Sequence, residues 1–184
     1  NKYLDSVQEP SQLSNSIEGN FDSSFVINEK FVLYGICEIN NIDYLFSLNL
    51  KKTKQDIYLI KKFKNFAGDL SSNTTASLLS WIEWDAPYMP WEKNDLFFAQ
   101  IGLDGEIQKI KKFSNKFINI KKKVSFFQPY WISETILVCS EDSSGWWNLL
   151  FLDVSEIENI FIKKRVERNL IEYGAPQWVS GITF

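Results

Sequence analysis

Two carboxylates, Glu83 and Asp85, have the spacing in this chain that best suggests chemistry. On alternate positions of an extended strand both would share one face, where paired carboxylates serve as acid and base in glycoside hydrolysis. The alternative is hydrogen bonding to the proline-rich loop that follows them. The chain contains no histidine, so its own residues cannot form a Ser-His-Asp triad.

Other catalytic and ligand-binding signatures are missing from the sequence. It has no GxSxG elbow, no phosphate-binding glycine loop and no Cys/His cluster with metal-ligand spacing. Cys37 and Cys139 each lie in a strand-like apolar run, which favours two buried reduced thiols over a disulfide or a catalytic pair. We therefore expect no catalytic residue, no cofactor and no metal site in this chain, and reduced cysteines suit a cytoplasmic location.

The composition predicts a compact domain and excludes several classes of protein. Of 184 residues, 45% are hydrophobic and 16% aromatic, which is enough for a large core. A net charge of -3 argues against a nucleic-acid binder, and no apolar run reaches the roughly 20 residues that span a bilayer. Lysines cluster at 61–64 and 109–123; a solvated face is favoured over a phosphate-binding stripe.

Short aromatic and β-branched runs dominate the chain and predict an all-β fold. A polar Asn40-Asn41 turn joins the first two runs into a hairpin. Helix is scarce, with at most one turn at 155–159. The expected strands are 31–37, 42–48, 56–60, 76–84, 95–101, 106–110, 135–139, 147–152 and 157–162.

A repeat of about fifty residues is superimposed on these strands. Leu45, Leu96 and Leu149 occupy like places in middle strands, 51 and 53 residues apart. Such a period is typical of propeller blades, whereas a β-sandwich would show turns without it. We predict a partial β-propeller of about three four-stranded antiparallel blades plus the start of a fourth. The expected units are a partly disordered lead-in at 1–24 and a propeller fragment at 25–184, with blades at about 25–65, 66–114 and 124–165 and the next beginning at 172–184.

The segment from Trp84 to Trp91 contains two prolines that stop strand pairing and fix φ, so it predicts an ordered loop between the first two strands of a blade. One interpretation is a loop that offers its tryptophans to a peptide in a substrate funnel. The other, which we favour, is a loop packed on itself that makes the blade rigid, because large aromatic side chains are rarely left exposed.

A second segment, Asp142 to Asn148, combines an acidic residue, serines and a glycine, which indicates a tight hairpin turn. The adjacent Trp146 and Trp147 would then alternate on the following strand and point to opposite faces of the sheet. One tryptophan would face each neighbouring blade, a packing role and not a catalytic one.

Together these segments resemble the amino-terminal β-propeller of prolyl oligopeptidase family serine peptidases, in the dipeptidyl aminopeptidase/acylaminoacyl peptidase branch. The resemblance is clear from about residue 79 onward and weaker before it. Four motifs in order carry the resemblance, and their residues are expected to be structural: Trp84, Asp85, Pro87, Met89, Pro90 and Trp91; Gln128, Pro129 and Trp131; Gly145, Trp146, Trp147 and Asn148; Gly174, Pro176 and Trp178.

The resemblance implies a function for the parent polypeptide. In this family a propeller covers an α/β-hydrolase domain that carries the triad, and it restricts the size of the peptide substrate. We expect this chain to be an excised piece of such a propeller, with further chain before Asn1 and after Phe184. Its partners would be the downstream hydrolase domain and, through that enzyme, the peptide.

Two further expectations concern association. A stand-alone propeller-like scaffold that binds a protein partner through its loops, such as 87–91, is the alternative function. Open blade edges of a fragment should also seek partners, which predicts a homodimer. Neither nucleic acid nor a membrane is an expected partner.

Overall fold

A computed structural model describes residues 11–15, 17–22, 26–52, 54–113, 123–166 and 170–174. These residues form thirteen strands in three antiparallel sheets, and no helix occurs among them. The first sheet holds β1 (Asn20–Phe21), β2 (Val26–Ile27), β3 (Val32–Ile39), β4 (Ile42–Asn49) and β5 (Tyr58–Lys62); the second β6 (Phe66–Ser72), β7 (Leu78–Trp84), β8 (Asp95–Ile101) and β9 (Ile107–Lys112); the third β10 (Phe126–Trp131), β11 (Ile136–Glu141), β12 (Asn148–Asp153) and β13 (Phe161–Val166).

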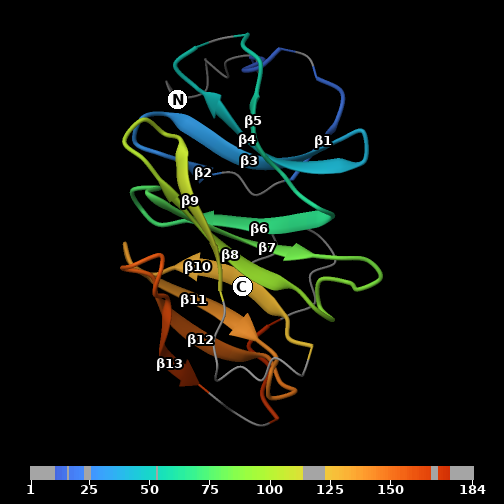
Figure 1. Ribbon diagram of the computed structural model, residues 1–184, viewed down its shortest axis with the longest axis vertical. Coiled ribbons are helices and arrows are strands. Elements are labelled where there is room, and N and C mark those ends of the chain that lie inside the picture. Colours follow the sequence, from blue (N-terminus) through green and yellow to red (C-terminus); the bar gives the residue numbers. More distant parts are fainter. Residues whose placement is uncertain are drawn as a thin grey trace, which may run out of the picture.

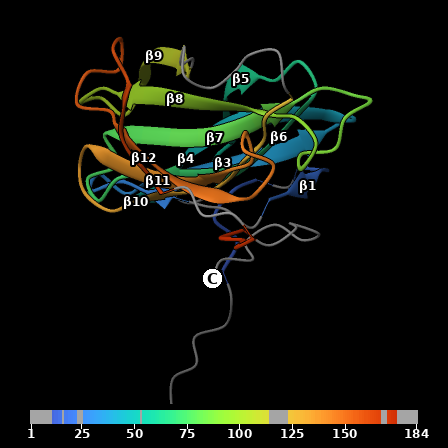
Figure 2. The ribbon, with the colours of Figure 1, turned by 90° about the horizontal axis from the view of Figure 1, so that it is seen from below.

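The three sheets are stacked face to face in chain order, as Figure 1 shows. Each is a meander in which consecutive strands pair, except that β1 and β2 both pair with β3. Figure 2 shows β5 and β9 on one side of the stack and β1 and β10 on the other. The first strands of the second and third sheets, β6 and β10, contact each other. This is the arrangement of neighbouring propeller blades, whose first strands converge on one axis.

Apolar layers between the sheets form the core. The layer between the first and second sheets is built around Tyr34, Leu45 and Trp81, all fully buried. Leu96 and Leu150 lie in the layer between the second and third sheets. A third cluster covers the other face of the first sheet: Cys37, Phe46 and Leu48.

The leucines that set the repeat lie on β4, β8 and β12, the third strands of their sheets. Leu45 and Leu96 are fully buried, each against the following sheet. Leu149 is half-buried, because it points away from the layer that its neighbour Leu150 fills. The fifty-residue period therefore marks one face of each blade.

Most expected strands occur, with the bounds of β8 as predicted. The first strands β6 and β10 were not predicted as strands. Each contains a β-bulge with a residue at positive φ, Asp69 (56°) and Gln128 (51°), which breaks the alternation of apolar and polar residues. The prediction of a strand at 157–162 is wrong for residues 157–160, since β13 begins at Phe161.

The lead-in segment contributes to the first sheet. β1 pairs with β3, and Phe21 packs edge-on against Phe46 at 5.6 Å. No helix in the described part of the chain is long and apolar enough to cross a membrane. The expected start of a fourth blade lies mostly in residues 175–184, outside the described residues.

Candidate functional site

The proline-rich loop occupies residues 85–94 and connects β7 to β8. These are the second and third strands of their sheet, so the prediction of a loop between the first two strands is wrong; the unpredicted β6 precedes them. The loop is hydrogen-bonded within itself. Tyr88 N–H donates to the Asp85 carbonyl at 3.1 Å, and Met89 N–H donates to the Glu92 carboxylate at 2.9 Å.

The aromatic residues of this loop differ in how they are packed. Trp84 stacks on Phe66 of β6, with ring centroids 5.7 Å apart. Tyr88 is half-buried, and the ammonium groups of Lys93 and Lys123 lie 5.3 and 4.3 Å from its ring centroid. Trp91 is half-buried too. Two ammonium groups thus approach the ring of one tyrosine.

Pro87 and Met89 form the exposed crest of the loop, and Met89 is 46% exposed. The peptide bond from Ala86 to Pro87 is cis. Pro90 is half-buried, and its carbonyl accepts hydrogen bonds from other residues near the base of the loop.

The carboxylates of the acidic pair accept hydrogen bonds from residues that precede the loop in the chain. Glu83 accepts hydrogen bonds from Lys61 at 2.7 Å and from the Trp81 indole at 2.8 Å. Asp85 accepts from Asn65 at 2.5 Å and from Lys64 at 3.1 Å. For these carboxylates the expected partners were wrong, because the end of β5 and the connection from β5 to β6 lie beside the end of β7.

These bonds also bear on acid chemistry. Hydrogen bonds from Asn65 and then Lys64 hold the pKa of the Asp85 carboxyl below its usual value. A general acid in glycoside hydrolysis needs a raised pKa so that it keeps its proton. Asp85 is therefore a poor general acid, and the pair serves to join two blades.

A cavity of about 370 Å³ lies beneath the loop, and its wall includes Lys64, Trp84, Ala86, Tyr88, Asn94 and Phe97. A second cavity of about 390 Å³, lined in part by Asp43 and Asn65, lies next to it and shares Lys64. Both are lined by the connection from β5 to β6 and by a connection that leaves a second strand, β3 in one case and β7 in the other. This is where a ligand could reach the proline-rich loop.

Asn94 fixes the base of the loop to the third sheet. Its side chain is buried and donates to the carbonyls of Pro90 and Phe126, each at 2.8 Å, and to the Ser125 hydroxyl at 2.8 Å. Its carbonyl oxygen accepts from Phe126 N–H at 2.9 Å. Sequence reasoning missed both Asn94 and Ser125; polar residues next to predicted strands are common, and only the fold shows that these are buried.

Ser125 links the two motif segments. Its hydroxyl donates to the Pro90 carbonyl of the proline-rich loop. Its N–H donates to the Asp142 carboxylate at 2.7 Å, and its carbonyl accepts from Asp142 N–H at 3.3 Å. The proline-rich loop and the hairpin at 142–147 are thereby bound to one buried residue.

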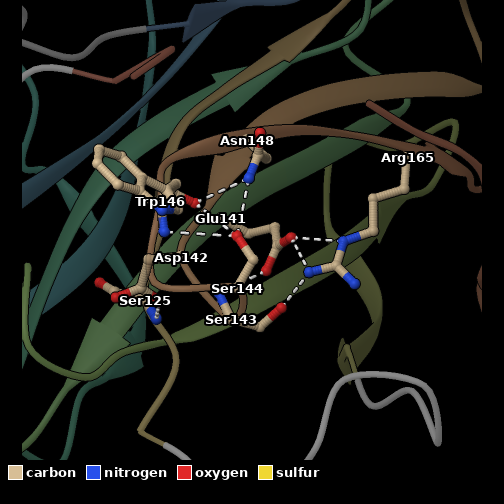
Figure 3. A network of polar contacts seen from close by, with 8 residues as sticks. All are labelled: Ser125, Glu141, Asp142, Ser143, Ser144, Trp146, Asn148 and Arg165. Atoms are coloured by element: carbon tan, nitrogen blue, oxygen red, sulfur yellow. Dashed lines mark hydrogen bonds and ion pairs between the residues drawn. The ribbon is translucent and has the colours of Figure 1, made fainter. Parts of the chain in front are cut away.

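The hairpin at 142–147 connects β11 to β12 and is drawn in Figure 3. Gly145 adopts a φ of 89°, and its N–H donates to the Asp142 carbonyl at 2.8 Å. The fully buried Asn148 side chain donates to the Ser144 hydroxyl at 2.8 Å and to the Trp146 carbonyl at 3.2 Å. The predicted tight turn is present, and the motif asparagine closes it.

A buried ion pair supports the same hairpin. Glu141 is fully buried, and its carboxylate accepts from Arg165 Nε at 2.7 Å and from Ser143 N–H at 2.9 Å. The guanidinium of Arg165 also donates to the Ser143 hydroxyl, so the arginine reaches from β13 across to the turn (Figure 3). Next to this pair, burial raises the pKa of the Asp142 carboxyl, and Glu141 adds to the rise.

The tryptophans of the hairpin both precede β12, so the expectation that they alternate on that strand is wrong. Trp147 stacks on Phe127 of its own sheet, with centroids 4.3 Å apart. Its N–H donates to the Glu172 carboxylate at 2.6 Å, and its carbonyl accepts from Tyr173 N–H at 2.8 Å. A Cβ at Gly174 would lie 3.3 Å from the Trp147 side chain, which accounts for a small residue there.

The remaining motif residues lie on or beyond β10. Gln128 forms the bulge of β10, and its N–H donates to the Asp69 carboxylate of the neighbouring blade at 3.4 Å. Pro129 is buried, and Trp131 donates from its indole to Ser80 of β7 at 3.1 Å. Pro176 and Trp178 lie outside the described residues.

The described residues hold no group of three or more histidine, cysteine or acidic side chains that could bind a metal. Cys37 and Cys139 are both buried and free, as the sequence predicted. Burial raises the pKa of the Cys37 thiol to about 11 and also raises that of Cys139. Neither thiol is poised as a nucleophile.

No protein-family model matches the sequence, and no curated protein matches it significantly. Several solved structures do match the chain. The chain is similar to a puromycin-hydrolyzing peptidase of Mycobacterium tuberculosis (TM-score 0.67, 18% identity, 89% of this chain and 26% of that one). It is also similar to puromycin hydrolase (TM-score 0.72, 18% identity, 94% of this chain and 27% of that one). A mutant of that enzyme complexed with PGG is similar as well (TM-score 0.74, 19% identity, 94% of this chain and 27% of that one).

The chain thus spans about a quarter of the length of the proteins it resembles. The resemblance predicted from the motifs, to peptidases of the prolyl oligopeptidase family, is matched by this structural likeness. At these identities the likeness shows the fold, and the chain is a partial β-propeller like that in one part of the puromycin-hydrolyzing peptidases.

Proposed function

We propose that this chain is the substrate-gating and docking portion of a propeller in a prolyl-oligopeptidase-type serine peptidase. The single observation that carries the proposal is the fold, three adjacent blades that match part of puromycin-hydrolyzing peptidases. The chain has no histidine, so the triad would come from an α/β-hydrolase domain downstream. The chain alone is then inactive, and the parent enzyme acts on peptides in the cytoplasm.

The polar network supports a gate that selects by size. A gate of this kind has to keep its shape when a peptide presses against it, and Ser125 ties the loops at 85–94 and 142–147 together through bonds of 2.7–2.8 Å. Asn94 adds three further hydrogen bonds at the same place. A surface held in this way excludes large substrates sterically and needs no reactive group.

The decisive experiment joins this chain to its downstream coding sequence and assays hydrolysis of peptides of increasing length. We expect a GxSxG serine in the added region and a catalytic efficiency that falls with peptide length. Replacing residues 86–92 by a two-residue turn should relax the length dependence. The matched control shortens the turn at 73–77, at the opposite ends of the strands, and should leave it unchanged.

A second candidate is a stand-alone scaffold that binds a protein partner. The exposed Met89 and Pro87 at the crest of the loop favour it. A stop codon shortly after Phe184 in the gene, with no hydrolase domain, would select this function. Pairing of open blade edges would make the isolated chain a dimer in either case, and a monomeric mass at high concentration would count against that association.

A further inference from the structure

We propose that the proline-rich loop at 85–94 and the segment at 172–174, where the predicted fourth blade begins, open and close as one unit. The two segments belong to different blades. A series of buried contacts connects them through the start of β10 and the hairpin at 142–147. This inference goes beyond the proposed function, because it concerns a motion within the chain and holds whether the loop meets a substrate or a protein partner.

The series begins at Asn94, which closes the loop. Its side chain holds the backbone of Phe126 twice: it accepts from Phe126 N–H at 2.9 Å and donates to the Phe126 carbonyl at 2.8 Å. It also donates to the carbonyl of Pro90 inside the loop at 2.8 Å. Asn94 is only 3% exposed, so water does not readily replace these bonds. A shift of the base of the loop therefore acts directly on β10.

Two contacts lead from the start of β10 to the hairpin at 142–147. Ser125 N–H donates to the Asp142 carboxylate at 2.7 Å, and both residues are drawn in Figure 3. The fully buried Phe127 stacks on Trp147, with ring centroids 4.3 Å apart. Ser125 and Phe127 are the chain neighbours of Phe126. The position in which Asn94 holds Phe126 therefore sets both contacts to the hairpin.

The hairpin in turn holds the segment at 172–174. Trp147 N–H donates to the Glu172 carboxylate at 2.6 Å, and the Trp147 carbonyl accepts from Tyr173 N–H at 2.8 Å. The Ser140 hydroxyl donates to the Tyr173 carbonyl at 2.8 Å. Glu172 and Tyr173 are exposed, and an exposed segment held by a few hydrogen bonds opens locally at low cost in free energy. Its attachment therefore depends on where Trp147 lies.

The consequence is a coupling between the crest of the loop and the attachment of the next blade. When the loop is released from Phe126, the hairpin loses the support that orients Trp147, and the segment at 172–174 is released as well. Such a coupling is reciprocal. A ligand that holds the loop closed strengthens the attachment of this segment, and the attached segment strengthens the binding of the ligand by the same factor.

The test measures amide hydrogen exchange in the full chain by NMR and needs no ligand. The amide of Tyr173 reports opening of the segment, and a rate that low concentrations of urea leave unchanged identifies a local opening. In Asn94→Ala we expect this amide to exchange about tenfold faster than in the unchanged chain. Asn94 and Tyr173 lie at opposite ends of the series of contacts, so loss of a direct bond between them does not account for this change.

Asn73→Ala is the matched control. Asn73 is 2% exposed and also joins the second sheet to the third, because its side chain donates to the Glu134 carbonyl at 2.9 Å and accepts from Leu78 N–H at 3.1 Å. It lies at the opposite ends of the strands, in the turn between β6 and β7. This variant loses comparable buried bonds, and its Tyr173 amide should exchange at the rate of the unchanged chain.

The reciprocal variant is Glu172→Ala, which removes an exposed acceptor and tests the inference even if Asn94→Ala does not fold. We expect the amide of Phe126 to exchange several-fold faster in this variant, although Glu172 does not bond to it. An unchanged Tyr173 rate in a folded Asn94→Ala, equal acceleration by Asn73→Ala, or an unchanged Phe126 rate in Glu172→Ala would overturn the inference.

Discussion

Lys61 donates a hydrogen bond to Glu83 at 2.7 Å across the boundary between the first and second blades. The same carboxylate oxygen accepts from the Trp81 indole at 2.8 Å. The Lys61 ammonium also lies 4.1 Å from the ring centroid of Phe63 and 5.7 Å from that of Phe97. One lysine thus joins two blades through a carboxylate and aromatic rings.

Removing the carboxylate from this contact should be costly. In Glu83→Ala, the mostly buried Lys61 loses its counter-charge and the Trp81 indole loses its acceptor. We expect the free energy of unfolding to fall by about 2 kcal/mol, measured by urea denaturation. The control is Lys112→Gln, which breaks the exposed pair with Asp95 and should cost less than about 1 kcal/mol. Equal losses in the two variants would refute the role of burial.

Asn94 offers a second test, of the link between the proline-rich loop and the third sheet. Asn94→Ala removes bonds to Pro90, Ser125 and Phe126 and takes away the acceptor of the buried Phe126 N–H. We expect a loss of about 2–3 kcal/mol in the free energy of unfolding. The exposed Asn20→Ala, whose side-chain contact to Glu38 is 3.5 Å long, should change it by less than about 0.5 kcal/mol. If Asn94→Ala unfolded at the same temperature as the unchanged chain in a thermal melt, this role would be contradicted.

The sequence predicted the parts of the fold that depend on local pattern. β8 alternates apolar residues between two buried layers, and its bounds, 95–101, were predicted in full. Asn40 and Asn41 adopt φ values of 52° and 61°, as a two-residue hairpin turn demands and asparagine tolerates. Strand alternation and turn chemistry are both readable within a few residues.

The parts of the fold and of the site that the sequence did not predict depend on contacts between segments that are distant in the chain. β10 contains Pro129, which argues against a strand, but the bulge at Gln128 accommodates it. The partner of Glu83 is 22 residues away, and Ser125 meets Asn94 across 31 residues. Only the stacking of blades brings such residues together, so no local pattern could have identified them.

The two cysteines should be unreactive in the folded chain. Cys37 is almost completely buried with its pKa raised to about 11, and Cys139 is buried with its pKa raised as well. Neither will be a thiolate at about pH 8, so a thiol reagent should react with neither until urea unfolds the chain, and then with both. Rapid modification of one thiol in the native chain would show that its blade opens locally.

Asp142 should make stability depend on pH in the sense opposite to a typical paired carboxylate. Burial raises its folded pKa above the ordinary value of 3.8, so between these two values the folded chain binds more protons than the unfolded chain. The free energy of unfolding therefore falls as pH rises from 3.8 through the folded pKa. Asp142→Asn keeps an oxygen for Ser125 N–H and removes the titration, so its advantage over the unchanged chain should grow with pH across this window.

Asp85→Asn is the matched comparison, because hydrogen bonds from Asn65 and Lys64 lower the pKa of Asp85. The contribution of Asp85 to stability is present above pH 3.8 and is lost as pH falls through its folded pKa. Urea denaturation of the three chains at several acidic pH values measures both effects. Parallel curves for Asp142→Asn and the unchanged chain would mean that Asp142 titrates alike in the folded and unfolded states, and that burial at the hairpin does not raise its pKa.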